Sequence, residues 1–448
     1  MTRSFYPARP RSLLYVAFYF PPTRASGVYR ALATANFFAA HGWDVTVITV
    51  GREFFFDVLR SYDESLESQV RDDVRVERVH FSPVHFSGAV WGPEIRKYNW
   101  LQAHFPTRNT KFRKWLKRRV FPEQYWPWIP GVVRRGLALH RRQPFDAILA
   151  TGNPHASFVA AWLLSRLIRR PYAIDYRDSW TVDIFEGIPA FPPSHPAWRW
   201  ERRVISKAAR IVFVNQALRV WHAERYPESA DRMMVVQNGY DPGFLGDGLQ
   251  CDPAPHDRPL RFGYLGTITR KVPLQQFIEA WRLAREEPEL GGAEALLYGY
   301  LGFVSSNIPD LYNKLSTVDS IGVRYRGPVS KAEVIRVYEE LDVLLLILAG
   351  SRHVTSGKVY EYIATGKPIV SIHQPDSAAN EILKGYPLWF PVRDLEAESV
   401  RDALLDAARA VRSLTPDQVA QCRQHAKRFS RGAQLRPLEV ALREVVHG

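Results

Sequence analysis

Apolar runs of strand length alternate with helix-length segments through the first half of the chain. The predicted strands of this half are residues 13–20, 45–50, 147–150, 172–175 and 211–215. The predicted helices are residues 29–40, residues 155–167 and a segment that ends at residue 209. Apolar strands that alternate with helices are typical of a parallel sheet covered on both faces. This half is therefore predicted to be a doubly wound α/β domain.

A second pattern of the same kind begins near residue 260, after a segment rich in Gly, Asp and Pro. Its predicted strands are residues 260–265, 295–299, 323–327, 343–348 and 369–372, and its predicted helices are residues 274–285, 331–340 and 358–365. The predicted organisation is a first domain at 1–240, a linker at 241–258, a second domain at 259–428 and a final helix at 429–448. Two doubly wound domains that face each other leave a cleft at the carboxyl ends of their strands, where open parallel sheets bind ligands. We expect the active site in that cleft.

The charge balance is strongly basic, with a net charge of +14 over 448 residues. Such a charge predicts a polyanionic partner. The candidates are nucleic acid, an anionic membrane and phosphorylated substrates. The two cysteines fit a reducing cytoplasm. No window approaches the ~20 apolar residues of a membrane-spanning helix, and the first residues lack the cleavage site of a secretory signal. We therefore expect a cytoplasmic protein.

The stretch 356–370 is the most informative part of the chain. It predicts a helix that begins after Ser356 and Gly357, ends at a glycine and leads into an apolar strand. Lys358 and Glu361 lie three residues apart, so both side chains leave the same face of the helix and can meet one ligand. The alternative is an ordinary helix cap with a surface lysine and glutamate.

This helix resembles one in the nucleotide-sugar glycosyltransferases of the retaining GT-B class, of the glycosyltransferase family 4 or group 1 type. That family carries Glu-x-x-Ala-x-Gly-x-Pro, which is matched here by Glu361, Ala364, Gly366 and Pro368. The resemblance implies two Rossmann-like domains that face a central cleft. It also implies that Glu361 holds the ribose of the donor nucleotide, and that the final helix packs back on the first domain.

A glycine-rich turn ends the first strand of the second domain, where Gly266 is followed by Arg270 and Lys271. The resemblance places the diphosphate of the donor here, and a solvated basic pair is the alternative. Two positions depart from the family. Thr267 stands where an arginine is common, and His353 stands where a glutamate contacts the donor sugar. The identity of the sugar therefore stays open, and a catalytically silent protein with this fold is an alternative.

Three loops of the first domain follow predicted strands. The loop with Ser26 and Gly27 resembles the glycine-rich first loop of the family, and a purely structural turn is the alternative. Arg177, between two carboxylates, can present a fixed positive edge to the acceptor, and His155 can exchange a proton near neutral pH. The resemblance makes His155 and Asp178 catalytic candidates on the acceptor side. A helix cap and a structural ion pair are the alternatives.

Retention of configuration implies a leaving diphosphate whose own oxygen assists deprotonation of the acceptor. Arg270, Lys271 and Lys358 would neutralise that diphosphate, and Arg270 is the third catalytic candidate. The sequence has no spaced His and Cys ligand set and no Asp-x-Asp motif. We therefore expect no cofactor and no required metal ion.

Basic and aromatic residues interleave in the segment 96–142. This composition suits the headgroup layer of an anionic membrane, and it also suits single-stranded nucleic acid, whose bases stack on aromatic rings. A helix with aromatic side chains in the core and charges in water is the third interpretation. If this segment binds a membrane, a lipid-linked acceptor is the simplest reason for that binding.

Together these features predict a glycosyltransferase, of the hexosyl or N-acetylhexosaminyl type, that works in cell-surface polysaccharide or glycolipid biosynthesis. It would move a sugar from a nucleotide-diphosphate sugar to a glycan or lipid-linked acceptor, as a cytoplasmic protein that is peripheral at the inner membrane face. A sugar-nucleotide epimerase or hydrolase of the same fold is an alternative. A non-catalytic basic binding protein is another, although nucleic acid is not the partner we expect.

Overall fold

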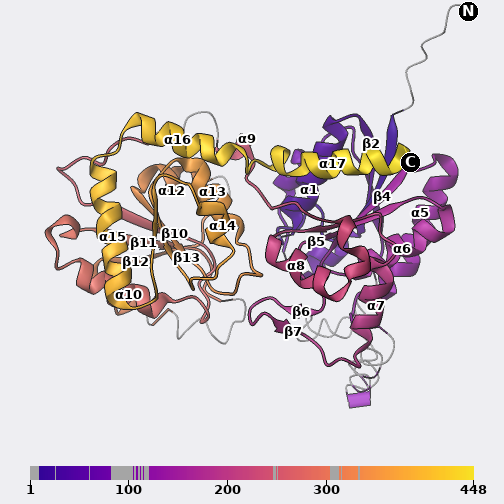
Figure 1. The fold of residues 1–448 in the computed structure, drawn as a ribbon, viewed down its shortest axis with the longest axis horizontal. Coiled ribbons are helices and arrows are strands. Elements are labelled where there is room, and N and C mark those ends of the chain that lie inside the picture. The colour runs from indigo at the N-terminus through magenta and orange to yellow at the C-terminus, as the bar shows by residue number, and fades with distance from the viewer. Residues whose placement is uncertain are drawn as a thin grey trace, which may run out of the picture. The chain divides into compact units, whose positions relative to one another are not determined.

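A computed structural model shows two compact units, which are described separately below (Figure 1). The first unit comprises Met1–Asp183, Ile188–Val236 and Leu435–Gly448, and the second comprises Ile184–Gly187 and Gln237–Gln434. The described residues are 10–25, 27–59, 61–81, 104, 107, 108, 111, 115, 121–245, 249, 251–302, 312, 313, 315–330 and 333–447. Ser26, the start of the predicted helix at 331 and most of the basic segment before residue 121 lie outside them.

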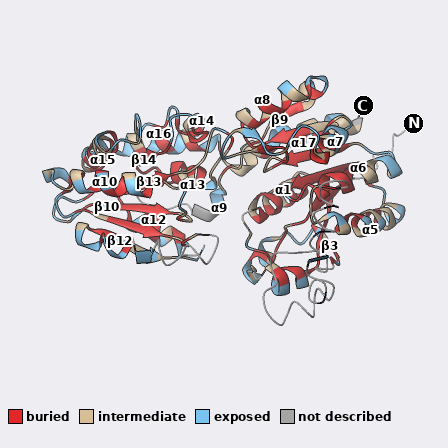
Figure 2. Ribbon diagram, turned by 90° about the horizontal axis from the view of Figure 1, so that it is seen from below, coloured by how far each residue is buried: buried red, intermediate tan, exposed pale blue. Residues whose placement is uncertain are grey.

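The first unit is built on a sheet of seven parallel strands in the order β3-β2-β1-β4-β5-β8-β9. Its strands are β1 (Arg11–Ala17), β2 (Trp43–Val50), β3 (Arg75–Val79), β4 (Ala147–Gly152), β5 (Tyr172–Tyr176), β8 (Arg210–Phe213) and β9 (Met233–Val235). The central strands β1, β4 and β5 are almost wholly buried, which explains why apolar residues predominate in their sequences. Figure 2 shows the buried residues in the interior of the unit, including much of α1, and the exposed ones on its outside.

Helices cover this sheet. They are α1 (Val28–Ala40), α5 (Ile129–Arg142), α6 (Ala156–Ile168), α7 (Pro196–Ile205), α8 (Gln216–Arg225) and the later part of α17 (Arg431–His447). A two-stranded antiparallel hairpin, β6 (Val182–Asp183) with β7 (Ile188–Pro189), follows β5. Among the helices that the structure describes, none is both long enough and apolar enough to pass through a lipid bilayer.

The second unit repeats the architecture with six parallel strands in the order β12-β11-β10-β13-β14-β15. Its strands are β10 (Arg261–Leu265), β11 (Glu294–Tyr298), β12 (Val323–Gly327), β13 (Val343–Ile347), β14 (Ile369–Ile372) and β15 (Trp389–Pro391). Its helices are α9 (Pro242–Leu245), α10 (Leu274–Ala284), α12 (Val334–Glu340), α13 (Gly357–Thr365), α14 (Ala379–Leu383), α15 (Ala397–Arg412) and α16 (Pro416–Lys427).

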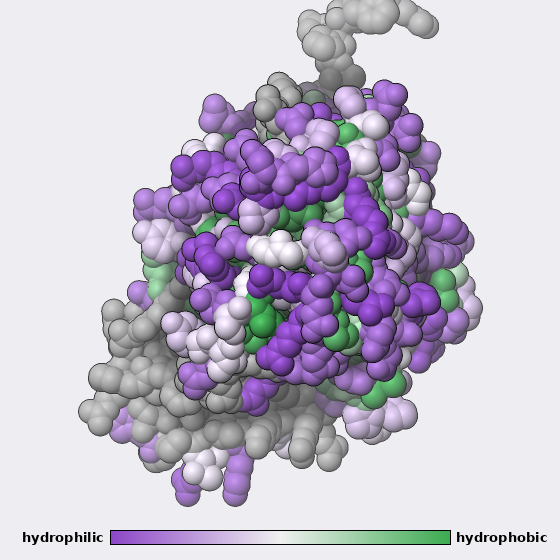
Figure 3. Space-filling model, turned by 90° about the vertical axis from the view of Figure 1, so that its left-hand side faces the viewer, coloured by the Kyte–Doolittle hydropathy of each residue, from purple (hydrophilic) through white to green (hydrophobic). Residues whose placement is uncertain are grey.

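Two separate apolar cores lie against the two faces of this second sheet. Helices α10 and α15 contribute to one core, and α12, α13, α14 and α16 contribute to the other. The surface is mainly polar, in contrast to these cores. Figure 3 shows a face on which hydrophilic side chains predominate and hydrophobic ones form small separate spots. The predicted class of two doubly wound, Rossmann-like α/β domains is confirmed.

The segment 241–258, which we expected to be a linker, belongs to the second unit. Ala254 is buried, its N–H donates to Val411 O at 3.0 Å, and its carbonyl accepts from Arg412 at 3.1 Å. Cys251 Sγ likewise lies 3.5 Å from Gly366 O. The linker interpretation was wrong because a composition rich in Gly, Asp and Pro limits regular structure, here to the four-residue helix α9 among the described residues of the segment, but does not exclude packing.

Helix α17 contributes to the core of the first unit through Leu435, Leu438 and Leu442, which are buried against strands β1 and β2 and helix α1. Trp43 Nε1–H also donates to the buried Glu439 Oε1 at 2.8 Å. The last helical segment of the chain is therefore a structural part of the first unit, although it follows the second unit in sequence.

Replacing Leu438 or Leu442 with alanine should lower the free energy of unfolding of the first unit by about 2–5 kcal/mol, because each change leaves a cavity in its core. Urea-induced unfolding would measure the loss. Val440→Ala on the same helix is the control, since Val440 is 44% exposed and should change stability by about 0.5 kcal/mol at most. Equal effects of the buried and exposed changes would contradict the packing of α17.

Candidate active site

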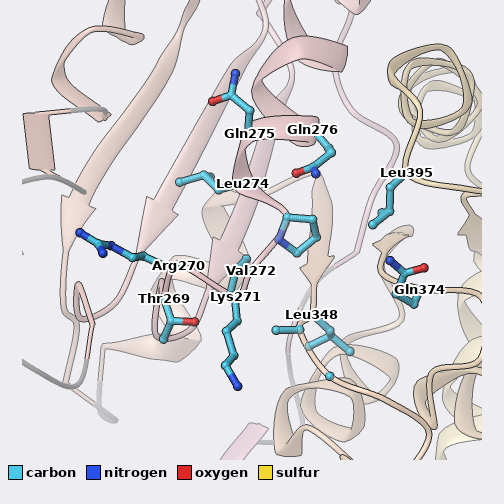
Figure 4. Close-up of a pocket in the computed structure, with 13 residues that line it drawn as sticks. Thr269, Arg270, Lys271, Val272, Leu274, Gln275, Gln276, Leu348, Gln374 and Leu395 are labelled. Carbon is cyan, nitrogen blue, oxygen red and sulfur yellow. The ribbon is translucent and has the colours of Figure 1, made fainter. Parts of the chain in front are cut away.

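The strand order of the second unit reverses between the adjacent strands β10 and β13, and most of the predicted donor residues lie in the loops that follow them or on helix α13. Such a reversal leaves a crevice at the carboxyl ends of the strands. A cavity of about 570 Å³ lies there, between the loop after β10, the start of α10 and the loop after β13. Arg270 and Lys271 both line it, and Figure 4 shows their charged ends pointing in different directions.

Gly266 does not line this cavity. Its N–H donates to Tyr298 O at 2.9 Å. Its carbonyl oxygen lies so close to Gly299 that a Cβ added to Gly299 would be only 1.9 Å from it. Gly299 itself has a positive φ of 134°. The glycine-rich turn after β10 is therefore held by close backbone packing against the end of β11, and this packing sets the start of the loop that carries Arg270 and Lys271.

Helix α13 begins and ends as its sequence predicts. Ser356 is the N-cap, and its hydroxyl accepts from Lys358 N–H at 3.3 Å. Gly357 is the first helical residue, and a Cβ added there would meet nothing within 4 Å. Gly366 ends the helix in the left-handed conformation, with φ of 83°. The open space at Gly357 leaves the backbone of the first turn accessible.

Lys358 and Glu361 meet on one face of α13, as predicted, with Lys358 Nζ 2.9 Å from Glu361 Oε2. The sequence did not predict the second partner, Tyr338 on α12, whose hydroxyl donates to the same carboxylate oxygen at 2.9 Å. Burial, and then the Glu361 carboxylate, raise the pKa of Tyr338 well above its ordinary value, so this hydroxyl keeps its proton. The Glu361 carboxylate is thus held by side chains from two helices, Lys358 of α13 and Tyr338 of α12.

His353, the position that departs from the family, is buried, and its Nδ1 lies 3.1 Å from Ser351 Oγ. The backbone N–H of His353 donates to the same hydroxyl at 3.2 Å. The histidine is therefore part of the folded loop after β13 and is not a solvent-exposed side chain.

In the first unit the strand order reverses between β1 and β4, and Arg177 lies where the loops after β1, β4 and β5 meet. Its guanidinium donates to Asn153 O at 3.0 Å and lies 3.5 Å from Asp178 Oδ2. A Cβ on Gly27 would lie 1.4 Å from Arg177 Nη1. Glycine at position 27 therefore makes room for the arginine beside the start of α1.

The expectation that Arg177 lies between two carboxylates was wrong for Asp175. Asp175 instead forms a buried ion pair with Arg30, in which Nε and Nη2 donate to the two carboxylate oxygens at 2.8 and 2.7 Å. Arg30 Nη2 also donates to Val236 O at 2.9 Å. The reason is a turn at the end of β5, where Arg177 N–H donates to Asp175 O and the chain leaves the strand.

Both ring nitrogens of His155 face oxygen atoms of the protein. Nδ1 lies 3.0 Å from Glu123 Oε1, and Nε2 lies 3.2 Å from Asp178 O. The Glu123 carboxylate also accepts from the backbone N–H groups of His155 and Ala156, at 2.9 and 2.8 Å, and so caps the start of α6. The His155 ring stacks on Trp180 with centroids 4.9 Å apart. These contacts agree with the packing interpretation of His155, but its side chain makes no capping hydrogen bond, because Glu123 caps the helix instead.

Asp178 presents its backbone carbonyl to His155 and leaves its side chain 45% exposed. Of the three acceptor-side candidates, Arg177 and Asp178 thus lie together at the end of β5, while His155 is tied to Glu123. No sequence signal pointed to Glu123, because it lies 32 residues before His155 and outside any helix or strand.

Three solved structures share the fold over nearly the whole chain. A glycosyltransferase of Rickettsia africae has 13% identity and a TM-score of 0.64, covering 98% of this chain and 99% of that chain. Sucrose-phosphate synthase of Thermosynechococcus elongatus has 13% identity and a TM-score of 0.63, with 98% and 99% covered. HepE of Anabaena, solved in complex with UDP, has 14% identity and a TM-score of 0.62, with 97% and 100% covered. The chain has the predicted GT-B fold of glycosyltransferases.

Residues 25–239 match the family model described as "Glycosyl transferase 4-like domain". This match spans most of the first unit and agrees with the resemblance that the sequence motifs indicated. A search of curated proteins finds no significant sequence match.

Replacing Asp175 with asparagine should lower the free energy of unfolding by about 3–5 kcal/mol, because the change leaves the buried Arg30 guanidinium without its counter-charge. Asp178→Asn is the control. Its side chain is about half-exposed, so its loss should cost about 1 kcal/mol at most. Urea-induced unfolding would compare the two variants, and an unchanged stability of Asp175→Asn would contradict the assignment of the ion pair.

Proposed function

We propose that this protein transfers a sugar from a nucleotide-diphosphate sugar to a glycan or lipid-linked acceptor, with retention of configuration at the anomeric carbon. The observation that carries the proposal is the crevice of the second unit, where a cavity lined by Arg270 and Lys271 follows the adjacent strands β10 and β13. Helix α13 also follows β13, although none of its residues lines the cavity. HepE of Anabaena, which shares the fold, was solved in complex with UDP-glucose. A nucleotide sugar is therefore the donor class that we propose.

The diphosphate of the donor would lie against cationic side chains and helix amides. The cavity volume of about 570 Å³ falls within the usual range for a small-ligand site. Arg270 and Lys271 line it, and the N-terminus of α13 offers backbone N–H groups at Gly357, where no side chain blocks the approach of an anion. The glycine at this position therefore favours direct contact between backbone and phosphate.

Glu361 would accept hydrogen bonds from the ribose hydroxyls. Its side chain is 20% exposed, so a ligand can reach it. Lys358 and Tyr338 both donate to its Oε2 atom, which restricts the rotation of the carboxylate before the ligand arrives. Such preorganisation lowers the entropy that binding would otherwise cost.

The proposed transfer breaks the bond between the sugar and the diphosphate and forms a new glycosidic bond on the same face. The acceptor hydroxyl gives its proton to an oxygen of the leaving diphosphate, whose charge Arg270, Lys271 and Lys358 neutralise. No cofactor is part of this reaction, and it requires no metal ion because the three cations supply the positive charge. Arg177 and Asp178 are proposed to orient the acceptor, with His155 supporting their loop.

Whether donor is converted with and without acceptor distinguishes sugar transfer from the alternative functions of a protein with this fold. A transferase consumes the donor only when an acceptor is present, whereas an epimerase or hydrolase of the same fold converts the donor alone. A non-catalytic protein with this fold would bind a nucleotide and convert nothing. Incubation of a labelled donor with and without acceptor extract therefore distinguishes the three.

At least one nucleoside diphosphate should raise the melting temperature of the protein in the presence of a metal chelator, because a ligand that binds only the folded state stabilises it. Glu361→Ala should remove most of this shift, since a hydrogen bond to a charged group contributes about 1.5–3 kcal/mol. Glu398→Ala, an exposed glutamate of the same unit, is the control. A full shift in Glu361→Ala, or a shift that requires metal, would refute these assignments.

Tyr338→Phe should weaken binding of that nucleotide about tenfold, since the ring still packs edge-on against Tyr362 but the hydrogen bond to Glu361 is lost. The weakening should largely disappear with the 2′,3′-dideoxy form of the nucleotide, because Tyr338 acts through the carboxylate that holds the ribose hydroxyls. Calorimetric titration of both ligands against both proteins forms a double-mutant cycle. Equal losses for the two nucleotides would show a general structural role for Tyr338 instead.

A further inference from the structure

A second hollow lies on the first unit, between helices α5 and α6. It is a groove of about 530 Å³ whose walls are mostly aliphatic. The lining residues are Ile129, Pro130, Val133, Arg134, Leu137 and Arg141 of α5 and Leu163 of α6. None of the proposed donor or acceptor residues belongs to it.

Helix α5 has one side in the core and another along this groove. Val132 and Leu139 are buried beneath the helix, and Gly136 allows close contact with α6, since a Cβ there would lie 2.8 Å from a methyl group of Leu164. Val133 and Leu137 are only partly buried and line the groove. The groove side therefore remains apolar after the core of the unit is complete.

The two arginines of the groove are exposed, and within the described part of the chain neither has an ion-pair or hydrogen-bond partner. Helix α5 contains no acidic residue. Its neighbour Arg135, by contrast, is paired with Glu77 at 2.5 Å. Two unpaired cations beside an aliphatic groove are complementary to a ligand with an anionic head and an apolar tail.

We propose that this groove docks the first unit on a membrane that contains anionic phospholipids. Arg134 and Arg141 bind the phosphate headgroups, while Val133, Leu137 and Leu163 contact the upper part of the acyl chains. The proposal concerns a surface and does not depend on the sugar-transfer reaction.

The lining of the groove favours lipid over single-stranded nucleic acid. Nucleic acid binding without sequence preference uses aromatic side chains on which bases stack, and the groove lining contains none. Leu167, one turn after Leu163 on α6, is 58% exposed and extends the aliphatic surface beyond the groove. An exposed leucine of this kind suits the acyl region of a bilayer.

Sedimentation of the full chain with lipid vesicles tests the proposal. The protein should bind vesicles of phosphatidylglycerol mixed with phosphatidylcholine and should not bind phosphatidylcholine alone. The double change Arg134→Gln and Arg141→Gln should lower the partition coefficient about thirtyfold, since each basic residue at an anionic surface contributes about a factor of five. Leu137→Gln should weaken binding to the same vesicles without changing the charge.

The matched control is Arg199→Gln with Arg336→Gln, two exposed arginines on α7 and α12. This control removes the same charge and should leave most of the binding intact. Three results would overturn the proposal: no binding of the wild-type protein to anionic vesicles, an equal loss in the control, or unchanged binding of the groove variant. A single-stranded oligonucleotide that binds through Arg134 and Arg141 while vesicles do not would also overturn it, in favour of nucleic acid.

Discussion

In each sheet the strand order reverses once, between β1 and β4 in the first unit and between β10 and β13 in the second. The positions of the candidate site residues depend on the parallel pairing of strands at these points. All strands of a parallel sheet end at the same edge, and where the order reverses, neighbouring loops diverge and leave room for a ligand. In the second unit the loops after β10 and β13 diverge in this way, and in the first unit those after β1 and β4 do. The predicted charged groups of the site follow these strands or β5, so the backbone hydrogen bonds of the sheets position them, whereas Tyr338 and Glu123 reach the site from other segments.

The interior strands of each sheet could be predicted from the sequence, whereas of the edge strands only β12 (Val323–Gly327) was predicted. Central strands such as β1 are buried on both faces and appear as unbroken apolar runs. The edge strand β3 (Arg75–Val79) has three charged residues and no regular alternation of charged and apolar positions, and β9 (Met233–Val235) has only three residues. Neither carries a signal that distinguishes it from a loop, because an edge strand buries little surface and gains its conformation from its single neighbour.

For the candidate site, the sequence predicted a contact between side chains of one helix but not the contacts between side chains of different elements. The contact of Lys358 with Glu361 follows from the helical repeat alone. Tyr338 lies 23 residues before Glu361 on another helix, so only tertiary packing brings the two together. The same limit explains Asp175, whose partner Arg30 lies 145 residues away in a helix that is otherwise mostly apolar.

Helix α17 also has a consequence for how the chain is made. The first unit is discontinuous, because Leu435–Gly448 complete it after the whole second unit has been synthesised. While the nascent chain emerges from the ribosome, the apolar surface that Leu435, Leu438 and Leu442 later cover has no partner from the chain itself. The core of the first unit therefore stays incomplete until the second unit has been synthesised, and exposed apolar surface of this kind is prone to aggregation in the meantime.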